Sequence, residues 1–565
     1  MSERRSISQV MFGYLPEQTV DVRGGVWRVQ EWRGAIVESN IDDRALRKEL
    51  CRLARQWAGS GRDGGFVADL ERNRARIVVK SLDKARGVHL RRFPEIWYCR
   101  RCRRMHDALD ARCNCGSSER KGQLQFVMYC EDTGELREPS IRRCQTHNAS
   151  RITFPGTASG GEIRFDCPEC GQHLRNGLGF SRSSSGAVMK ANVHRAASVY
   201  TPRSVVVVNP PSPSISREIE QAGGGRRALD WVLDGMSTRS MTDVAVTGDT
   251  LRERLLASGL AADLVEQMVA MAASQGGLAA GGPASLVLAD DVRESAEEQA
   301  LSVAVAMAEG RTTIADLASR TDALTERGHR YHDRYPVALS LSGLERVDLV
   351  ERFPVLTGHF GYTRGNPEPG AARLNTFRER RGAYVVYGAV AVTEALYFAL
   401  DPAAVARWLA AKGYALEAFS DARSARISLL RAMAGGGALV DDVTTLVHSY
   451  AHRLIRMVAV HAGIELSSLS ELLLPTHLSF FVYAAARGDF VLGGLQALFE
   501  NDLDRLLRQF VDGEHRCALD PGCARGGGAC MACLHLGEPS CRLFNGKLDR
   551  RTLTGPEGYL TILPL

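Results

Sequence analysis

Cysteine pairs are the residues of this chain whose type and spacing are best suited to chemistry. All of the 14 cysteines except Cys51 fall into two clusters, at residues 99–170 and 517–541. Thiolates held in tight turns can close a tetrahedron around zinc. In a reducing compartment such clusters indicate metal ligation rather than disulfides. We therefore expect about three structural zinc ions in this chain.

The first expected zinc site is the most local one. Cys99-Arg-Arg-Cys102 forms a two-residue knuckle, and Cys113-Asn-Cys115 follows it closely. The gap between Cys113 and Cys115 is shorter than usual but is tolerated in zinc ribbons. A redox role for a lone Cys-x-x-Cys is less favoured, because four cysteines crowd one short segment. These four thiols are predicted to bind one zinc ion.

The second expected site has a clear knuckle and less certain partners. Its predicted ligands are Cys130, Cys144, Cys167 and Cys170. Cys167-Pro-Glu-Cys170 is the knuckle, whereas Cys130 has the alternative interpretation of a buried core cysteine. Cys144-x-x-His147 is an alternative half-site, and His173 lies just beyond the knuckle. The sequence leaves these alternatives open.

The third expected site lies near the end of the chain. Its candidate ligands are Cys517, Cys523, Cys530, Cys533 and Cys541, with His515 and His535 in reserve. Cys530-Met-Ala-Cys533 is the knuckle, Cys541 is expected to join it, and Cys523 or Cys517 completes a set of four ligands. An iron–sulfur cluster is the rival interpretation, and the glycine-rich knuckle favours zinc. All-thiolate sites leave no open coordination position, so they stabilise a fold and do not activate water.

Catalytic motifs are few. No G-x-x-x-x-G-K-[ST] motif occurs, so ATP hydrolysis is not expected. His448-Ser-Tyr-Ala-His452 places two histidines on one helix face, as in zinc hydrolases, but Ser449 replaces the catalytic glutamate. His461 and Glu471 are possible third ligands. Packed, hydrogen-bonded helix histidines are the favoured interpretation, and the chain is expected not to be an enzyme.

The elements that must position these residues indicate an α+β multidomain protein. Residues 42–57 have helical apolar spacing, residues 205–208 and 478–484 are strand-like, and residues 495–510 are helical again. The predicted segments are a mixed N-terminal region at 1–90, zinc-ribbon modules at 91–180, a largely helical middle region at 181–350 and a C-terminal domain at 351–565.

The distribution of charge indicates possible DNA contacts, and the hydropathy indicates the compartment. The net charge is +6, and residues 91–121 alone carry nine Lys/Arg against four Asp/Glu, a net +5. Arg100, Arg101, Arg103 and Arg104 are therefore candidate phosphate contacts. Phe93, Trp97 and Tyr98 are interleaved with them and can either stack on bases or, as we favour, cover the zinc knuckle. No membrane span or secretory signal is evident, so a cytoplasmic protein is expected.

The C-terminal motifs resemble those of a known family. Cys530-Met-Ala-Cys533-Leu534, Cys541-Arg-Leu-Phe544-Asn545 and Leu548-Asp549-Arg550 resemble the MrfA-like zinc-binding domain, found at the end of certain bacterial repair helicases. Residues 446–452 and 483–495 look like the helix and glycine-rich loop of that domain. The likeness covers roughly residues 440–552 and implies an α/β zinc-binding domain there.

The whole architecture resembles the DrmB family of the DISARM anti-phage system. The likeness rests on the cysteine pairs near residue 100, a His194-Arg195 element before a valine-rich strand, and the C-terminal domain. It implies a DrmA-like helicase partner of superfamily 2 or the Swi/Snf group, with which the chain would form a heterodimer. It also implies binding of foreign DNA, with a single-stranded end. Two alternatives stay open: a pure protein scaffold, and a metal-dependent hydrolase using His448 and His452.

Overall fold

A computed structural model describes most of the chain. Residues outside the description are 156–159, 244–250, 253–254, 257–259, 275–286, 309, 381, 486–492, 514–515, 538–539, 542 and 564–565. His515 and most of the glycine-rich loop expected at 483–495 therefore lie outside the described residues. The chain forms two compact units, one of residues 1–207 and 356–390 and the other of residues 208–355 and 391–565. The structure is a mixed α+β protein with cysteine clusters in its N-terminal and C-terminal regions.

The first unit begins with a small antiparallel sheet. Its strands lie in the order β1 (Ser2–Glu3), β6 (Val88–Arg92), β3 (Gly25–Trp32) and β2 (Thr19–Val22), and α1 spans Ile7–Gly13. The strand-like alternation of residues 18–32 becomes the hairpin of β2 and β3, because Arg23 and Gly24 both adopt positive φ in a two-residue turn. Val20 and Val22 of β2 and Val29 and Trp32 of β3 lie in one buried core.

A second layer of the first unit packs two helices on strands. α2 (Asp43–Gly59) begins at Asp42, whose carboxylate caps the Arg44 N–H, and buries Leu46, Leu50, Ala54 and Trp57 on one face. These side chains and α3 (Phe66–Glu71) pack against β5 (Ile77–Ser81), β16 (Thr201–Val208) and this unit's parts of β18 (Leu344–Thr363) and β20 (Tyr384–Leu400). β5 runs parallel to β20, and β4 (Ile36–Val37) and β19 (Asn375–Thr376) extend the edges.

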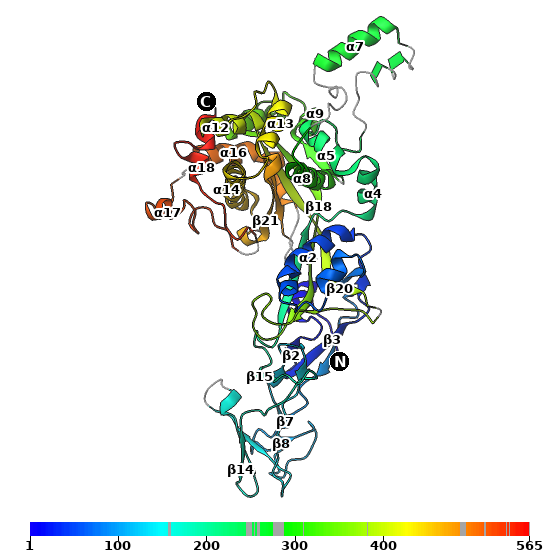
Figure 1. The fold of residues 1–565 in the computed structure, drawn as a ribbon, viewed down its shortest axis with the longest axis vertical. Coiled ribbons are helices and arrows are strands. Elements are labelled where there is room, and N and C mark those ends of the chain that lie inside the picture. Colours follow the sequence, from blue (N-terminus) through cyan, green and yellow to red (C-terminus); the bar gives the residue numbers. More distant parts are fainter. Residues whose placement is uncertain are drawn as a thin grey trace. The chain divides into compact units, whose positions relative to one another are not determined.

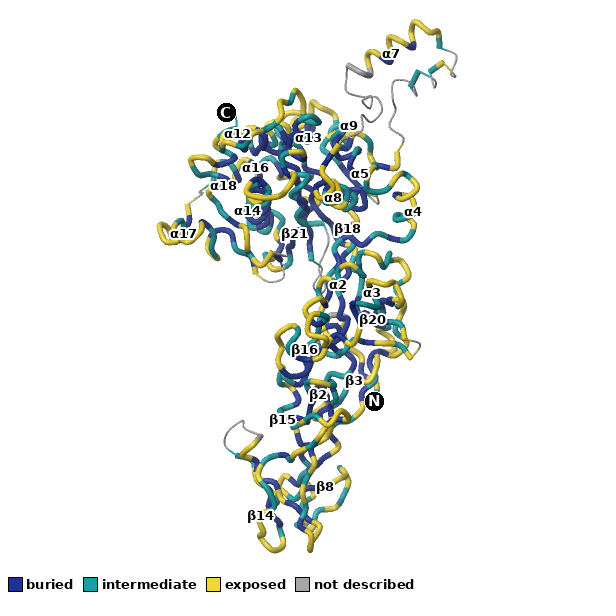
Figure 2. Tube along the Cα trace, viewed as in Figure 1, coloured by how far each residue is buried: buried dark blue, intermediate teal, exposed yellow. Residues whose placement is uncertain are grey.

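Residues 97–193 of this unit form three small sheets. Their strands are β7 (Trp97–Tyr98), β8 (Met105–His106) and β9 (Gly122–Gln123); β10 (Phe126–Tyr129), β11 (Leu136–Arg137) and β15 (Lys190–Val193); and β12 (Arg151–Thr153), β13 (Arg164–Asp166) and β14 (His173–Asn176). Each strand has two to four residues, and Figure 2 shows exposed residues predominating around β8 and β14. Strands this short bury little apolar surface, so another source of stability is needed here.

The second unit contains most of the helices (Figure 1). They are α4 (Pro213–Gln221), α5 (Gly224–Leu233), α7 (Ala262–Ser274), α8 (Asp290–Ala308), α9 (Ile314–Ser319), α10 (Glu326–His329), α11 (Tyr335–Ser342), α12 (Pro402–Ala411), α13 (Ala422–Ala432), α14 (Ala438–Ala462), α15 (Gly494–Asn501), α16 (Leu503–Asp512), α17 (Gly522–Arg525) and α18 (Arg551–Thr554). None of the described helices has the length and apolarity needed to cross a membrane.

The strands of the second unit support its longest helix. β22 (Ser479–Ala484) pairs antiparallel with both β20 and β21 (Leu469–Leu474), and β17 (Arg311–Thr313) pairs with β18. α14 packs against β21 and β22, and Figure 1 shows it beside β21. Tyr450 on α14 contacts Phe480 of β22 and Phe510 of α16. This packing buries one whole face of α14.

One expected helix is divided in the structure. Residues 495–510 were predicted as a single helix, whereas α15 ends at Asn501 and α16 begins at Leu503. Asp502 between them has φ −131° and ψ 12°, outside the helical region. Asparagine and aspartate compete with the helix backbone for hydrogen bonds, so the pair Asn501-Asp502 favours a break.

Candidate metal centres

The first cluster brings Cys99, Cys102, Cys113 and Cys115 together at the end of β7. The Sγ atoms of Cys99 and Cys115 are 3.6 Å apart, and those of Cys102 and Cys113 are 3.4 Å apart. Sulfurs around a tetrahedral zinc ion lie roughly 3.8 Å apart, given a Zn–S bond of about 2.3 Å. The four thiols predicted from the sequence therefore converge at a spacing that suits zinc.

Tight backbone turns create this cluster. The Arg103 N–H donates to the Cys99 carbonyl, and Gly116, at φ 71°, donates to the Cys113 carbonyl. The second turn accommodates the short gap between Cys113 and Cys115. Burial opposes ionisation of the Cys99 thiol, but backbone N–H groups of Cys102 and Arg101 and neighbouring thiols lower its pKa to about 6. A thiolate at neutral pH is the form that binds a metal.

The second cluster consists of Cys144, His147, Cys167 and Cys170. His147 Nδ1 lies 3.5 Å from the sulfurs of both Cys144 and Cys167. The Cys144–His147 pair precedes β12 and the Cys167–Cys170 pair follows β13, and the antiparallel pairing of these two strands brings the two pairs together. The Cys144-x-x-His147 half-site, weighed as an alternative from the sequence, is therefore the arrangement in the structure.

Cys130 lies apart from this cluster, so the structure corrects its predicted role as a ligand. It follows β10 in a different sheet, packs with Met128 and Met189, and its sulfur contacts the hydroxyls of Thr133 and Ser183. This corresponds to the core-cysteine alternative. His173 is also outside this cluster, and its Nδ1 lies 3.0 Å from the Asp166 carboxylate.

The third cluster consists of Cys517, Cys523, Cys530 and Cys533. The sulfurs of Cys517 and Cys530 are 3.4 Å apart, and those of Cys523 and Cys533 are 3.7 Å apart. The knuckle turn is closed by the N–H of Leu534, which donates to the Cys530 carbonyl. Both Cys517 and Cys523, between which the sequence could not choose, take part.

Cys541 is absent from the third cluster, although the sequence predicts it as a ligand there. The structure therefore corrects this assignment, as it does that of Cys130. Cys541 lies instead with His448 and His452 of α14 and Glu471 of β21, and the ligand-type atoms of these four residues all lie within 4.8 Å of one another. The sequence offers Glu471 as one possible third ligand beside His448 and His452, and favours simple packing of the two histidines. His461 does not join them, since its Nε2 lies 2.7 Å from Gln509 Oε1. Among the described residues, His535 joins no cluster.

The arginines of the first knuckle differ in their surroundings. Arg100 and Arg101 are exposed. The guanidinium of Arg103 lies 5.4 Å from the Tyr98 ring centre and also contacts Phe154, while Arg104 forms an ion pair with Glu169. Trp97 is buried, and Tyr98 meets the Phe154 ring edge-on. Trp97 and Tyr98 are thus engaged by other side chains of the protein, whereas Arg100 and Arg101 remain accessible.

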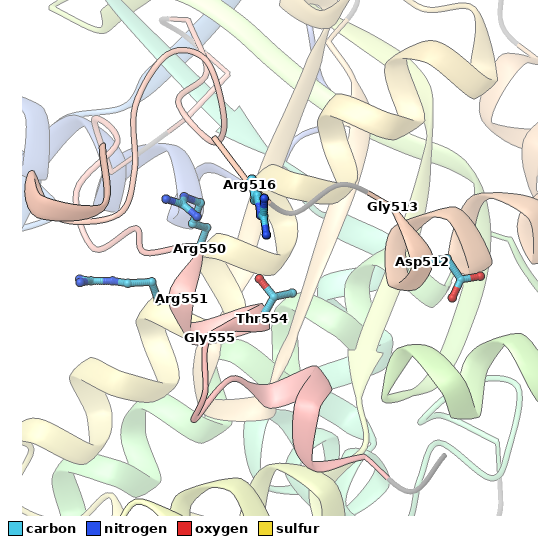
Figure 3. Close-up of a pocket in the computed structure, with 7 residues that line it drawn as sticks. All are labelled: Asp512, Gly513, Arg516, Arg550, Arg551, Thr554 and Gly555. Atoms are coloured by element: carbon cyan, nitrogen blue, oxygen red, sulfur yellow. The ribbon is translucent and has the colours of Figure 1, made fainter. Parts of the chain in front are cut away.

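An arginine-lined cavity lies beside the third cluster (Figure 3). It has a volume of about 620 Å³ and is lined by Asp512, Gly513, Arg516, Arg550, Arg551, Thr554 and Gly555. Arg550 pairs with Asp520, and both Nε and a terminal nitrogen of Arg551 contact Asp549. An anion entering this cavity must compete with these carboxylates, so the cavity is a weaker phosphate site than its arginine content alone suggests.

Comparison with known proteins covers only part of the chain. The model of a family described as a domain of unknown function, DUF8724, matches residues 6–201. That range contains the first two clusters and nearly all of the first segment of the first unit. A search of curated proteins found no match to the chain. The match extends over less than half of the sequence and says nothing of the third cluster or of α14.

Proposed function

We propose that the chain is a non-catalytic, zinc-stabilised subunit of a bacterial anti-phage complex that binds DNA and pairs with a DrmA-like helicase. Support for zinc comes from clusters of three or four thiols with few or no other ligands, which leave no position for a reacting water. Support for the complex and the helicase comes from the likeness of the whole architecture, with its MrfA-like domain at residues 440–552, to the DrmB family.

One observation carries the DNA-binding part of the proposal. The segment that bears the first cluster has exposed arginines that form no ion pair with any described residue: Arg91, Arg100, Arg101, Arg112 and Arg120. Guanidinium groups bind phosphate oxygens in a planar, bidentate manner. Each unpaired arginine can therefore neutralise one phosphate of a DNA strand without first breaking an internal ion pair.

Charge reversal tests this function in the full-length chain. The variant Arg100→Glu/Arg101→Glu should weaken binding to a duplex with a single-stranded tail, measured by fluorescence anisotropy between 50 and 200 mM salt. The slope of log K against log salt should become shallower by about 2, because each phosphate contact contributes roughly 0.9. The matched control is Arg72→Glu/Arg74→Glu, two exposed arginines of the same unit with the same change in charge.

The outcomes separate the DNA-binding and scaffold interpretations. Weaker DNA binding by Arg100→Glu/Arg101→Glu (the knuckle variant), with unchanged zinc content and unchanged DNA binding by the control, supports specific phosphate contacts. An equal loss of DNA affinity in the knuckle variant and in the control would indicate an effect of total charge only. Unchanged DNA binding in the knuckle variant, with retained co-purification of the helicase, would favour a protein scaffold. Absence of a stable complex on co-expression with a DrmA-like helicase would contradict the proposed partner.

A further inference from the structure

We propose that His448, His452, Glu471 and Cys541 form a fourth metal site, which binds one zinc ion and is structural. The Nε2 atoms of the histidines are 2.8 Å apart. Glu471 Oε1 lies 3.2 Å and 3.3 Å from them, and Cys541 Sγ lies 3.3 Å from His448 Nε2. Ligand atoms around tetrahedral zinc are roughly 3.3–3.6 Å apart, given bonds of about 2.0–2.3 Å. The four atoms thus already approximate a coordination shell.

The hydrogen bonds on the far side of each imidazole define its tautomer. His452 Nδ1 lies 2.8 Å from the Leu534 carbonyl, and His448 Nδ1 lies 3.2 Å from the Lys547 carbonyl. A carbonyl only accepts, so each Nδ1 carries a proton and donates it. In the neutral rings the two Nε2 lone pairs then face each other. A shared cation removes this repulsion, and Nδ1–H to carbonyl bonding is usual for metal-bound histidine.

Glu471 and Cys541 complete the evidence for a cation. The Glu471 side chain is fully buried, and its Oε2 has no hydrogen-bond partner among the described residues. A buried carboxylate oxygen without a partner is costly unless a cation compensates it. The backbone N–H of Asn545 lies 3.3 Å from Cys541 Sγ, an arrangement that stabilises a thiolate.

Charge and ligand type indicate which metal the site takes. Two neutral histidines, one carboxylate and one thiolate carry a charge of −2, so a divalent ion makes the fully buried site neutral. A set of two nitrogens, one oxygen and one sulfur suits zinc, whereas one thiolate cannot hold an iron–sulfur cluster. All four residues are buried, and four protein ligands leave no position for water. This site is therefore closed, unlike that of a zinc hydrolase.

The role of this fourth site follows from what it joins. Its ligands come from α14, from β21 and from the cysteine-rich segment, and Leu534, which accepts from His452, directly follows Cys533 of the third cluster. Arg456 of α14 adds hydrogen bonds to the carbonyls of Ala532 and His535. The fourth ion thus links the segment that carries the third cluster to α14 and β21.

Metal content of the intact chain tests the inference without any variant. Purified protein should contain four zinc ions by elemental analysis. After exchange with ¹¹³Cd, NMR should show three resonances in the region of thiolate-rich sites and one well outside it, from the site with a single thiolate. Three ions and three thiolate-rich resonances would overturn the proposal.

Variants then assign the fourth ion to its residues. Cys541→Ser should remove one metal ion and the resonance of the mixed site, while the thiolate-rich resonances stay. Cys530→Ser should remove a thiolate-rich resonance, and Cys51→Ser, at a cysteine outside every cluster, should change nothing. Retention of four ions by Cys541→Ser, with the mixed-site resonance unchanged, would contradict the assignment.

Discussion

The sulfur of Cys541 lies 3.3 Å from Nε2 of His448, a residue 93 positions earlier in the chain. This contact separates Cys541 from the knuckle formed by Cys530 and Cys533, to which it is much closer in sequence. The third cluster is complete without it, because Cys517 and Cys523 both contribute sulfurs. The spacing predicts one site with five candidate cysteines, of which one is spare. The structure has two clusters instead: one of four cysteines, and one that joins Cys541 to His448, His452 and Glu471.

Removal of zinc should unfold the small sheets of residues 97–193 before the rest of the first unit. The segment has strands of two to four residues and a small apolar core, so zinc bound at its two clusters would supply most of its stability. Treatment with a strong chelator, followed by limited proteolysis, should give early cleavage between residues 97 and 193. Early cleavage in α2 instead, whose face packs into a larger core, would contradict this prediction.

His147→Ala should remove one zinc ion, whereas Cys130→Ser should remove none. Nδ1 of His147 lies 3.5 Å from each of two cysteine sulfurs, while the Cys130 sulfur is held by the hydroxyls of Thr133 and Ser183 and by backbone N–H groups. Elemental analysis of the two purified variants measures the difference. Loss of zinc from Cys130→Ser with retention in His147→Ala would restore the ligand set expected from the sequence.

Arg364→Met should destabilise the first unit by about 3 kcal/mol, because three carbonyl groups, two of them buried, lose their donor. The guanidinium of Arg364 is fully buried and donates to the carbonyls of Gly134, Val199 and Glu17. Arg364→Lys should also be destabilising, since an ammonium lacks the planar fork.

Hydrogen–deuterium exchange in the peptides around Gly134 and Val199 measures the effect of these Arg364 variants. Both variants should exchange much faster there than the wild-type chain. Arg380→Met, at an exposed arginine of the same unit, is the control and should exchange as the wild type does. Equal protection in all of these proteins would show that Arg364 does not hold these segments together.

His359 should make the first unit less stable in mild acid. Burial lowers the pKa of this histidine to about 4, whereas an unfolded histidine titrates near 6.5. As the pH falls from 7.5 towards 4, the unfolded chain takes up a proton that the folded chain excludes. The free energy of unfolding should therefore fall by about 1.4 kcal/mol per pH unit below 6.5.

The variant His359→Gln isolates this contribution. Its loss of stability between pH 7.5 and 5.5 should be smaller than that of the wild-type chain by about 1 kcal/mol. Urea unfolding followed by tryptophan fluorescence at both pH values provides the comparison. Metal release at low pH affects both proteins alike, so it cancels in the difference. Parallel pH dependence in the two proteins would show that His359 becomes protonated without unfolding.

The spacing of residues along the sequence was enough to predict the features that form within one short segment of the chain. The Cys99, Cys102, Cys113 and Cys115 set, the Cys167–Cys170 knuckle and the placement of His448 and His452 on one helix face are each defined within a short segment. His147 could also be weighed from its position three residues after Cys144. Turn geometry and helical period carry this information, because they depend on a few consecutive residues.

Tertiary structure alone decided which distant residues meet. Cys130 and Cys144 are close in sequence, but Cys130 follows β10 and Cys144 precedes β12 of another sheet, so only the strand pairing separates them. His452, Glu471 and Cys541 meet because α14 packs on β21 and the cysteine-rich segment folds back over both. No local pattern encodes that approach, since it depends on the packing of whole elements and on the burial of their apolar faces.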